Sequence, residues 1–517
     1  MVWTPGVCVL VTSYFSIVLL LTVYGAHRGF LVMSCLRRRL PPAPMGTALP
    51  RVTVQLPLYN EAAVAERLLL ACAALDYPRA LLQIQVLDDS SDETTAIVGA
   101  VCARLSKDGL DIRHVRRGTR TGYKAGALAH GLSSATGELC AIFDADFVPS
   151  PDFLRQLVGH FADGAVACVQ ARWGHLNRRH SLFTEVQAMM LDGHHLVENR
   201  ARAANGHLFN FSGTGGIWRV SAIADAGGWQ HDTLVEDLDL SYRAQLRGWR
   251  LVYRPDVVAP AELPEEMSAY RAQQFRWAKG TVQSARKLLG RVWRSTRLGL
   301  GQKIEASFHL TPHFTSPLLL ALAILLLPTL ALLPGADPWA LALVDLPLMI
   351  CTTGSLALFY VHAERFQGRP GLGALRRLPA LMALGAGMTP WVTQAVFAGL
   401  GSVAGEFVRT PKRGTGPRRT ESAPWPVAEL ALAVASAAST VAAVLNGHWF
   451  AAPFAGLFTL GYGWVVVLLL TERSMACRHG SMPGRVEWDR KAHEATGAGA
   501  LDLCSTSRRG GTDGHGR

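Results

Sequence analysis

Residues 141–147 read AIFDADF, an apolar run that ends in two carboxylates, Asp144 and Asp146, one residue apart. If the run is a buried strand, the alternation of side chains along a strand places both carboxylates on the same side. Hard oxygen ligands of this kind suit Mg²⁺ or Mn²⁺, which commonly bridge a protein carboxylate to substrate phosphates. The alternative is a turn that carries two solvated acids, and these seven residues alone leave both interpretations open.

The composition indicates a membrane protein with one large soluble domain. Hydrophobic residues make up 49% of the 517 residues, which is too many for an ordinary soluble enzyme. They cluster in residues 7–26 and again after residue 308. The stretch of about 270 residues between these clusters is long enough for a domain with its own core. Arginine and lysine concentrate in loops beside the apolar segments, as in cytoplasmic loops of membrane proteins.

The sequence argues against a nucleic-acid-binding site and against a disulfide framework or zinc site. The net charge is +12 and the pI is about 9.5. The sequence nevertheless contains no basic helix with interleaved aromatic residues, so we do not expect nucleic acid as a partner. The nine cysteines are odd in number and form no Cys-x-x-Cys pair. This argues against a disulfide framework or a zinc site and fits a reducing compartment.

Strands and helices alternate between residues 51 and 143, which predicts a parallel sheet covered on both faces. The predicted strands are 51–57, 82–87, 111–115 and 139–143, and the predicted helices are 62–75, 94–105 and 125–134. In such sheets, ligands bind outside the carboxyl ends of the strands. Glu61, Asp89 and the pair Asp144 and Asp146 follow three of these strands, so they should line one crevice. Further along, the glycines of residues 213–216 allow the backbone to approach a ligand closely.

The apolar segments predict a membrane layout. Residues 1–36 are predicted as a transmembrane helix with its N-terminus outside, and residues 305–362 and 427–472 as two helix pairs, each helix near the ~20 residues that a bilayer needs. The helices of these pairs are placed at 308–333, 339–361, 427–446 and 450–471. Residues 378–400 are also apolar, but the loops 362–377 and 406–420 on either side are both basic and should both be cytoplasmic. We therefore predict five spans, an interfacial or re-entrant segment with a loop in 363–426, and a loosely ordered polar tail in 473–517.

Five motifs carry a resemblance to a known family. They are FDADF (143–147), VQARW (169–173), GTGGIWR (213–219), VEDLDL (235–240) and QQFRW (273–277). Together they resemble inverting family 2 glycosyltransferases with a GT-A fold over about residues 50–290. The processive membrane enzymes are more similar still: cellulose synthase, hyaluronan synthase and especially the plant cellulose-synthase-like A and C proteins. The fold implied is a cytoplasmic α/β GT-A domain with a Rossmann-like, mostly parallel sheet (50–290), inserted between transmembrane helices. Residues 407–412 are similar to the gating loop of bacterial cellulose synthase, with Arg409 in place of its valine.

The resemblance implies chemical roles for the motif residues. Asp237 would be the general base for the acceptor hydroxyl. Spacing alone instead favours a helix-capping role for the acids of residues 236–239, because acids favour helix N-termini. A Mg²⁺ or Mn²⁺ ion on Asp144 and Asp146 would act as Lewis acid on the leaving diphosphate. The resemblance further implies that Glu61, Asp89, Lys124, Gln273 and Arg276 bind the nucleotide sugar, and that Trp277, Glu236, Gly213 and Thr214 bind the acceptor.

The sequence thus predicts a membrane-embedded, inverting, processive β-1,4-glycosyltransferase. It would use GDP-mannose or UDP-glucose to extend and translocate a mannan- or glucomannan-like polysaccharide. The alternatives are a β-glucan synthase using UDP-glucose, a single-transfer lipid glycosyltransferase, and a non-enzymatic export subunit, which the intact acidic motifs disfavour. The expected partners are the nucleotide-sugar donor, a glycan acceptor and the lipid bilayer. An accessory export protein is a further candidate partner. The Ala-, Arg- and Gly-rich composition suggests the inner membrane of a bacterium.

Overall fold

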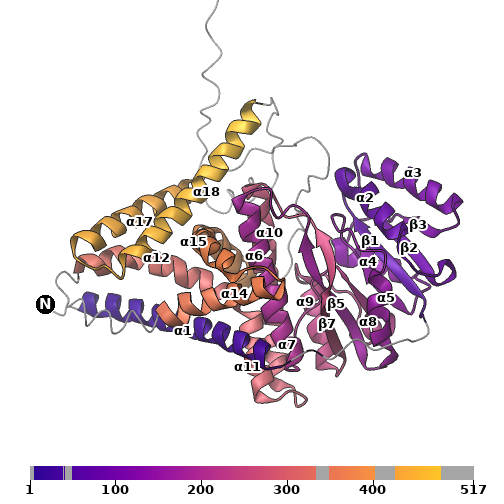
Figure 1. Ribbon diagram of the computed structural model, residues 1–517, viewed down its shortest axis with the longest axis horizontal. Coiled ribbons are helices and arrows are strands. Elements are labelled where there is room, and N and C mark those ends of the chain that lie inside the picture. The colour runs from indigo at the N-terminus through magenta and orange to yellow at the C-terminus, as the bar shows by residue number, and fades with distance from the viewer. Residues whose placement is uncertain (1–4, 39, 41–48, 333–348, 402–424, 479–517) are drawn as a thin grey trace, which may run out of the picture.

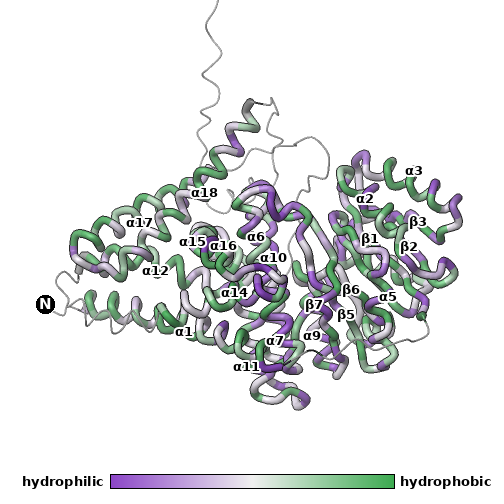
Figure 2. The backbone as a smooth tube through the Cα atoms, viewed as in Figure 1, coloured by the Kyte–Doolittle hydropathy of each residue, from purple (hydrophilic) through white to green (hydrophobic). Residues whose placement is uncertain are grey.

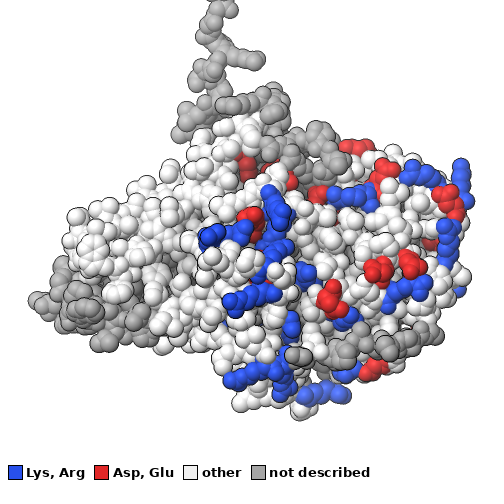
Figure 3. All heavy atoms as spheres, in the orientation of Figure 1, with Lys and Arg blue, Asp and Glu red and all other residues white. Residues whose placement is uncertain are grey.

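The computed structural model describes residues 5–38, 40, 49–332, 349–401 and 425–478. A sheet with its helices forms one half of the molecule, and a group of long helices forms the other (Figure 1). Hydrophobic residues run along most of the length of the long helices (Figure 2). Charged side chains gather on the sheet half and in the middle of the molecule, whereas the described part of the long helices at the left of the view carries almost none (Figure 3).

Seven strands form one sheet in the order β3-β2-β1-β4-β6-β5-β7. The strands are β1 (Val52–Leu58), β2 (Leu82–Asp88), β3 (Asp111–Val115), β4 (Leu139–Ile142), β5 (Val166–His175), β6 (Gly216–Arg219) and β7 (Arg250–Ala261). Strands β3, β2, β1 and β4 are parallel, as are β5 and β7, whereas β6 runs antiparallel to β4 and β5. The prediction of a mostly parallel α/β sheet is therefore confirmed.

The central strands are buried on both faces, although they carry polar residues. Thr53 donates a hydrogen bond to Gln83 Oε1 at 2.9 Å, and Gln55 donates to Gln85 Oε1 at 3.0 Å. These pairs link β1 to β2 side by side and satisfy part of the hydrogen-bonding capacity of the buried amides, while Gln55 Oε1 and Gln83 Nε2 have no partner within the described residues. Gly131 on the covering helix lies so close that a Cβ there would meet Gln55 Nε2 at 2.5 Å.

Helices cover the two faces of the sheet. They are α2 (Ala62–Ala73), α3 (Thr94–Lys107) and α5 (Phe153–Val158) on one face, and α4 (Tyr123–Leu132), α8 (Val220–Asp225) and α9 (Glu236–Leu246) on the other. Apolar side chains of these helices and of the strands form two buried clusters, one on each side of the sheet. Burial of this kind contributes roughly 25 cal/mol per Å² of apolar surface, and it fixes the strand ends that carry polar residues.

The strand predicted for residues 139–143 ends one residue early, at Ile142, and this corrects one expectation. Asp144 and Asp146 therefore do not alternate along a strand but lie in a turn, in which the Phe147 N–H donates to the Asp144 carbonyl at 3.1 Å. Ile142 is the last residue of β4 that pairs with β6, and it lies opposite Gly216. The turn that follows nevertheless directs both carboxylates into the same cavity.

The other half of the molecule consists of helices, most of them apolar. They are α1 (Pro5–Arg37), α11 (Leu300–Leu310), α12 (Thr315–Leu332), α14 (Ser355–Phe366), α15 (Gly371–Gly387), α16 (Thr389–Gly401), α17 (Val427–Leu445) and α18 (Ala452–Arg478). By length and hydropathy, four segments of the described chain could cross a membrane: Pro5–Arg37, Pro312–Leu330, Val427–Leu445 and Ala452–Ala476. These segments match four of the five predicted spans.

Two parts of the predicted layout have a different outcome. Helices α15 and α16 pass the same test only together, and they are bent by 48° at their break. A bent pair fits either a broken span or a re-entrant segment, so the layout predicted for 363–426 stays a prediction. The span predicted at 339–361 falls partly on residues 333–348, and the gating-like loop falls on residues 402–424. Both stretches lie outside the described residues, as does most of the predicted tail 473–517.

Helix α10 (Met267–Arg294) joins the two halves. Its first turn is capped from α18, because the Glu472 carboxylate accepts hydrogen bonds from the backbone N–H groups of Met267 and Ser268, the latter at 3.1 Å. One turn further, Arg271 pairs with Glu429 of α17 at 3.1 Å. A buried cluster of apolar residues from α1, α6 (Leu182–Gly193), α10, α14, α15, α16 and α18 fills the space around these contacts. The apolar helices therefore fix the position of a helix that also borders the cavity described next.

Candidate active site

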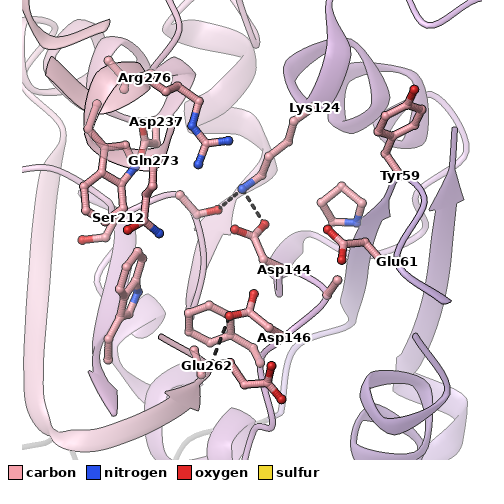
Figure 4. A pocket seen from close by; sticks show the side chains of 18 of the residues that line it. Tyr59, Glu61, Lys124, Asp144, Asp146, Ser212, Asp237, Glu262, Gln273 and Arg276 are labelled. Atoms are coloured by element: carbon pink, nitrogen blue, oxygen red, sulfur yellow. Dashed lines mark hydrogen bonds and ion pairs between the residues drawn. The ribbon is translucent and has the colours of Figure 1, made fainter. Parts of the chain in front are cut away.

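A cavity of about 170 Å³ opens at the carboxyl ends of β1, β2 and β4, where the alternating strands predicted it. Figure 4 shows Tyr59 and Glu61 on one wall, Asp144 and Asp146 at the base, and Asp237, Gln273 and Arg276 on the opposite wall. The lining includes the following predicted site residues: Glu61, Asp89, Lys124, Asp144, Asp146, Gly213, Glu236, Asp237, Gln273, Arg276 and Trp277. The fold thus brings together side chains that are more than 200 residues apart in the sequence.

Lys124 lies in the first turn of α4 and reaches across to the acidic base of the cavity. Its Nζ lies 2.5 Å from Asp144 Oδ1 and donates to the Gly213 carbonyl at 2.9 Å (Figure 4). Burial lowers the pKa of Lys124, but the carboxylates of Asp144 and Glu236 outweigh burial and raise it above its ordinary value. Lys124 is therefore a fixed positive charge in the cavity rather than a solvated surface lysine.

The two aspartates of the turn differ in exposure. The Asp144 side chain is 36% exposed, whereas Asp146 as a whole is 5% exposed and accepts a hydrogen bond from the Glu262 N–H at 3.2 Å. No group of three or more His, Cys, Asp or Glu side chains within the described residues could hold a metal ion alone. Two carboxylates in one cavity nonetheless fit a hard divalent cation whose other ligands come from substrate phosphates and water. The donor set therefore agrees with the predicted metal site.

Asp237 lies in the first turn of α9, and its carboxylate borders the cavity. Burial raises the pKa of Asp237 to about 7, the neighbouring charge of Glu236 adds to this rise, and Lys124 opposes it. A carboxylate with a pKa near 7 is suited to accept a proton at neutral pH. The same turn also contains Asp239, which is fully buried and pairs with Arg243 at 2.7 Å and Lys287 at 2.9 Å. Asp237 therefore borders the cavity, whereas Asp239 stabilises the fold through its ion pairs.

The residues of the Gln-x-x-Arg-Trp motif lie on one face of α10, because positions i, i+3 and i+4 of a helix are neighbours. Gln273, Arg276 and Trp277 all line the cavity. Burial lowers the pKa of Arg276, against the opposing effect of Glu236 and Asp144, but an arginine in a protein remains charged. Its guanidinium points towards the space above Asp144 and Lys124 (Figure 4). Two cations therefore face one another across the cavity, as a diphosphate group would require.

Asp89 and Glu61 belong to the wall of the cavity next to β1 and β2, opposite Arg276; this wall is called the far wall below. Both carboxylate oxygens of Asp89 accept hydrogen bonds from Arg117, at 2.7 and 2.6 Å. This bidentate pair orients Asp89 at the rim, where the resemblance implies a nucleoside. Glu61 directly precedes α2, and its carbonyl accepts hydrogen bonds from the N–H groups of Val64 and Ala65.

Thr214 is the predicted site residue that does not line the cavity. It has no exposed surface, and its Oγ1 accepts a hydrogen bond from the Asp144 N–H at 2.9 Å. It holds the turn that carries Asp144 and is not in contact with the cavity, so its predicted contact with the acceptor is not supported. The adjacent Gly213 has a φ of 82°, and a Cβ there would lie 3.0 Å from Asp237 Oδ2. Glycine at this position leaves room for the carboxylate.

The sequence interpretation missed several residues of the lining: Tyr59, Arg120, Trp173, Ser212 and Glu262. The Arg120 guanidinium lies over the Tyr59 ring at 3.4 Å from its centroid, which places a further cation at the far wall. Arg120 belongs to the basic stretch 116–124, and Trp173 ends the VQARW motif, so both had a signal in the sequence. Glu262 had none, because it enters the cavity only through its place at the end of β7.

A second cavity of about 390 Å³ adjoins the first. Trp173, Leu191, Ser212, Val235, Asp237, Gln273 and Trp277 line both cavities. From there the inner cavity extends to α1 and α11, with side chains that include Tyr24, His27, Arg28, Phe308 and His309. Its charged groups are largely paired, as in the contacts of Glu305 with His27 (2.6 Å) and with Arg202 (2.9 Å). The inner cavity thus leads from Asp237 towards the apolar helices.

Comparison with known proteins identifies the domain. Residues 50–280 match the sequence model of the family described as glycosyltransferase like family 2. With the mixed sheet and the acidic turn after β4, this match defines the class: residues 50–280 are a family 2 glycosyltransferase domain of the GT-A type. The predicted resemblance to this family is confirmed.

The similar curated proteins narrow this class. The chain is 40% identical over 284 residues to glucomannan 4-beta-mannosyltransferase 1 of Oryza sativa subsp. japonica, covering 53% of this chain and 54% of the relative. It is 42% identical over 260 residues to glucomannan 4-beta-mannosyltransferase 2 of Arabidopsis thaliana, covering 49% of each chain. The chain therefore spans about half the length of the curated relatives it matches. These relatives agree with the predicted likeness to the cellulose-synthase-like A group.

Solved structures also show similarity. The mannosyltransferase PcManGT from Pyrobaculum calidifontis, in complex with GDP-Man and Mn²⁺, aligns with a TM-score of 0.48 at 24% identity, covering 69% of this chain and 96% of that chain. TarS of S. aureus (residues 1–349) aligns with a TM-score of 0.38 at 18% identity, covering 68% and 88%.

Proposed function

We propose that this chain is a membrane-embedded, inverting, processive β-1,4-glycosyltransferase that extends a mannan- or glucomannan-like polysaccharide from a nucleotide sugar. One observation carries the proposal. Asp237, whose pKa burial raises to about 7, borders both a charged cavity at the strand ends and a larger inner cavity that leads to the apolar helices. A donor and a growing glycan chain could therefore meet at a single base.

The transfer step follows from the groups around Asp237. The acceptor hydroxyl oxygen forms a bond to the anomeric carbon of the donor, and the bond from this carbon to the diphosphate oxygen breaks. The hydroxyl proton passes to the Asp237 carboxylate, and the nucleoside diphosphate leaves with the bonding electrons. Because attack and departure occur on opposite faces of the anomeric carbon, the configuration inverts.

The leaving diphosphate needs positive charge, and the cavity supplies it from two elements. Arg276 of α10 and Lys124 of α4 face the same space, and electrostatic stabilisation of a leaving group is strong where water is excluded. Asp144 and Asp146 would hold a Mg²⁺ or Mn²⁺ ion, which when bound supplies Lewis acidity to the diphosphate. Asp89 and Glu61, at the far wall, would contact the nucleotide.

The inner cavity suits the acceptor glycan. Aromatic rings, histidines and paired charges line it, and these groups match the apolar faces and hydroxyls of an uncharged sugar chain better than they match a diphosphate. Four helices of the described chain could cross a membrane, and α1 and α11 border the cavity. The chain would hold its catalytic domain on the cytoplasmic side, in a bacterial inner membrane, and pass the polymer between its own helices.

The relatives favour GDP-mannose as the donor, because the similar curated proteins are named glucomannan 4-beta-mannosyltransferases. The test is product analysis. Purified full-length protein in lipid nanodiscs is incubated with Mn²⁺ or Mg²⁺ and with radiolabelled GDP-mannose, UDP-glucose or both. The products are separated by size and digested with a β-mannanase or a β-1,4-glucanase.

The outcomes separate the candidate functions. High-molecular-weight product that requires GDP-mannose and is cut by β-mannanase is the expected result. Polymer made from UDP-glucose alone and cut by the glucanase would make the protein a β-glucan synthase. One sugar on an extracted lipid would make it a single-transfer enzyme. No product with any donor would overturn the proposal.

A further inference from the structure

Two tryptophans face each other at the boundary between the two cavities. Trp173 lies near the carboxyl end of β5, and Trp277 lies on α10. Their ring centroids are 6.4 Å apart and their planes are inclined by 50°. Both side chains are partly exposed, and both line the outer and the inner cavity. Asp237 lines the same two cavities, so the pair stands at the point where a glycan in the inner cavity would reach the base.

The Trp173 indole is held firmly in this position. Its Nε1–H points to the Thr214 carbonyl at 3.4 Å, and its ring contacts Phe147 at a centroid distance of 5.5 Å and His195 at 5.3 Å. Each of these three residues is buried. The indole therefore has support on one side and presents its remaining surface to the cavities.

The spacing of the pair limits how a sugar can bind. Carbon atoms in contact lie about 3.5–4.0 Å apart, so a sugar ring sandwiched between two parallel indoles would need about 7–8 Å between them. The observed 6.4 Å is smaller, and the rings are not parallel. A sugar that stacks on Trp277 in this arrangement therefore touches Trp173 with its edge and cannot lie between the two faces.

We propose that Trp173 is an acceptor-binding residue: with Trp277 it forms an aromatic collar that the non-reducing end of the glycan passes on its way from the inner cavity to Asp237. The inference rests on the proposed function. The collar contacts the sugar next to the reacting one, through its C–H faces and edges, to which indole rings are complementary. Trp173 thereby contributes to acceptor affinity and to the retention of the chain between successive transfers.

The experiment compares Trp173→Phe and Trp173→Ala with the wild-type enzyme in nanodiscs. The donor is GDP-mannose with Mn²⁺, and the acceptor is β-1,4-mannohexaose. For Trp173→Ala, we expect the KM for mannohexaose to rise about 3- to 10-fold, the size of one aromatic contact, and the average product to become shorter. The KM for GDP-mannose should not change, and Trp173→Phe should fall between the alanine variant and the wild type.

The matched control is Trp293→Phe. Trp293 is a 46% exposed tryptophan near the end of α10, outside both cavities, and its Nε1–H donates to Ser307 at 3.1 Å. This variant should retain the wild-type KM values and product length. If Trp173→Ala does not fold, as judged by loss of stabilisation by GDP-mannose and Mn²⁺, the comparison rests on Trp173→Phe and Trp173→Leu.

The results distinguish this inference from the proposed function. A wild-type enzyme that makes no polymer would overturn the proposed function, and with it the collar. A wild-type enzyme that makes polymer, together with Trp173 variants whose acceptor KM and product length match the wild type, would overturn the collar alone. Folded Trp173 variants that change the KM values for mannohexaose and for GDP-mannose equally would show that Trp173 only packs the domain.

Discussion

The two cavities that meet at Asp237 are built from different chemistry. The carboxylates that line the outer cavity include those of Asp144, Asp146, Glu236 and Asp237, and its cations include Lys124 and Arg276. The inner cavity is more than twice as large, and five aromatic residues and five histidines contribute to its lining. Opposed charges suit a metal and a diphosphate, whereas rings suit a sugar chain. We infer that the donor and the acceptor bind in separate cavities lined by different types of side chain, and that the base Asp237 lies where these cavities meet.

The origins of the two linings also differ. Most charged residues of the outer cavity follow strands or begin helices of the sheet domain, where a parallel sheet directs loops to one edge. The inner cavity takes residues from α1, η3 (His194–Asn199), α10 and α11. It therefore exists only where the sheet domain meets the apolar helices. The following predictions test this division, beginning with the largest expected effect.

Asp237→Asn should remove the group that belongs to both cavities. An amide cannot take the proton of the acceptor hydroxyl, so we expect kcat to fall by about 10²–10⁴. Binding of GDP-mannose with Mn²⁺, measured by calorimetry, should remain within a few-fold of the wild type. Asp225→Asn, at an exposed ion pair with Arg247, is the matched control. An Asp237→Asn enzyme with more than a tenth of the wild-type kcat would assign the base elsewhere.

Asp146→Asn should affect only the outer cavity. Changes to groups around a metal commonly cost 10–100-fold in metal affinity, and loss of a direct ligand should cost about 100-fold or more. We therefore expect the Mn²⁺ concentration for half-maximal activity to rise by that factor, and EDTA to abolish wild-type activity until Mn²⁺ is restored. The KM for mannohexaose at saturating Mn²⁺ should stay unchanged. Full wild-type activity in EDTA would rule out the metal site.

The pH dependence should report the environment of Asp237 at the boundary. Because burial raises its pKa to about 7, the carboxylate is protonated and inactive as a base below that value. In the wild type, kcat should therefore fall about tenfold for each pH unit below 7 and level off above it. The residual activity of Asp237→Asn should lack this limb. A wild-type profile that is flat from pH 5 to 7 would contradict the assignment.

Thr214→Val should have the smallest effect, because this residue acts through the turn that it holds. Valine keeps the shape but leaves the Asp144 N–H without its buried acceptor, which should cost about 1–3 kcal/mol of stability. We expect a lower Tm and a decrease of about 3- to 10-fold in kcat. Thr214→Ser, which retains the hydroxyl, should restore both. A serine variant as impaired as the valine variant would show that packing, and not the hydrogen bond, matters here.

Much of the sheet and most of the candidate site were predictable from local patterns. The strands and helices between residues 51 and 143 lie within about three residues of their predicted ends, since alternating buried segments and polar loops are encoded locally. The spacing of Gln273, Arg276 and Trp277 placed them on one helix face, and the structure confirms that they line one cavity. Thr214 is the predicted site residue that is buried beside the cavity and does not line it, because sequence does not reveal which side of a turn is buried.

The sequence by itself determined the sheet domain, its strand-end acids, the apolar helices and the likeness to family 2, because each depends on residue types close together along the chain. The tertiary structure alone decided where β4 ends, how Asp237 acquires a pKa near 7, and which side chains stand between the cavities. These features arise from burial and from contacts across long sequence separations. Glu472 with the N-terminus of α10, Lys124 with Asp144, and Trp173 with Trp277 each lie 20 to more than 200 residues apart in the sequence. A local pattern cannot encode such pairs, because only the packed core brings their partners together.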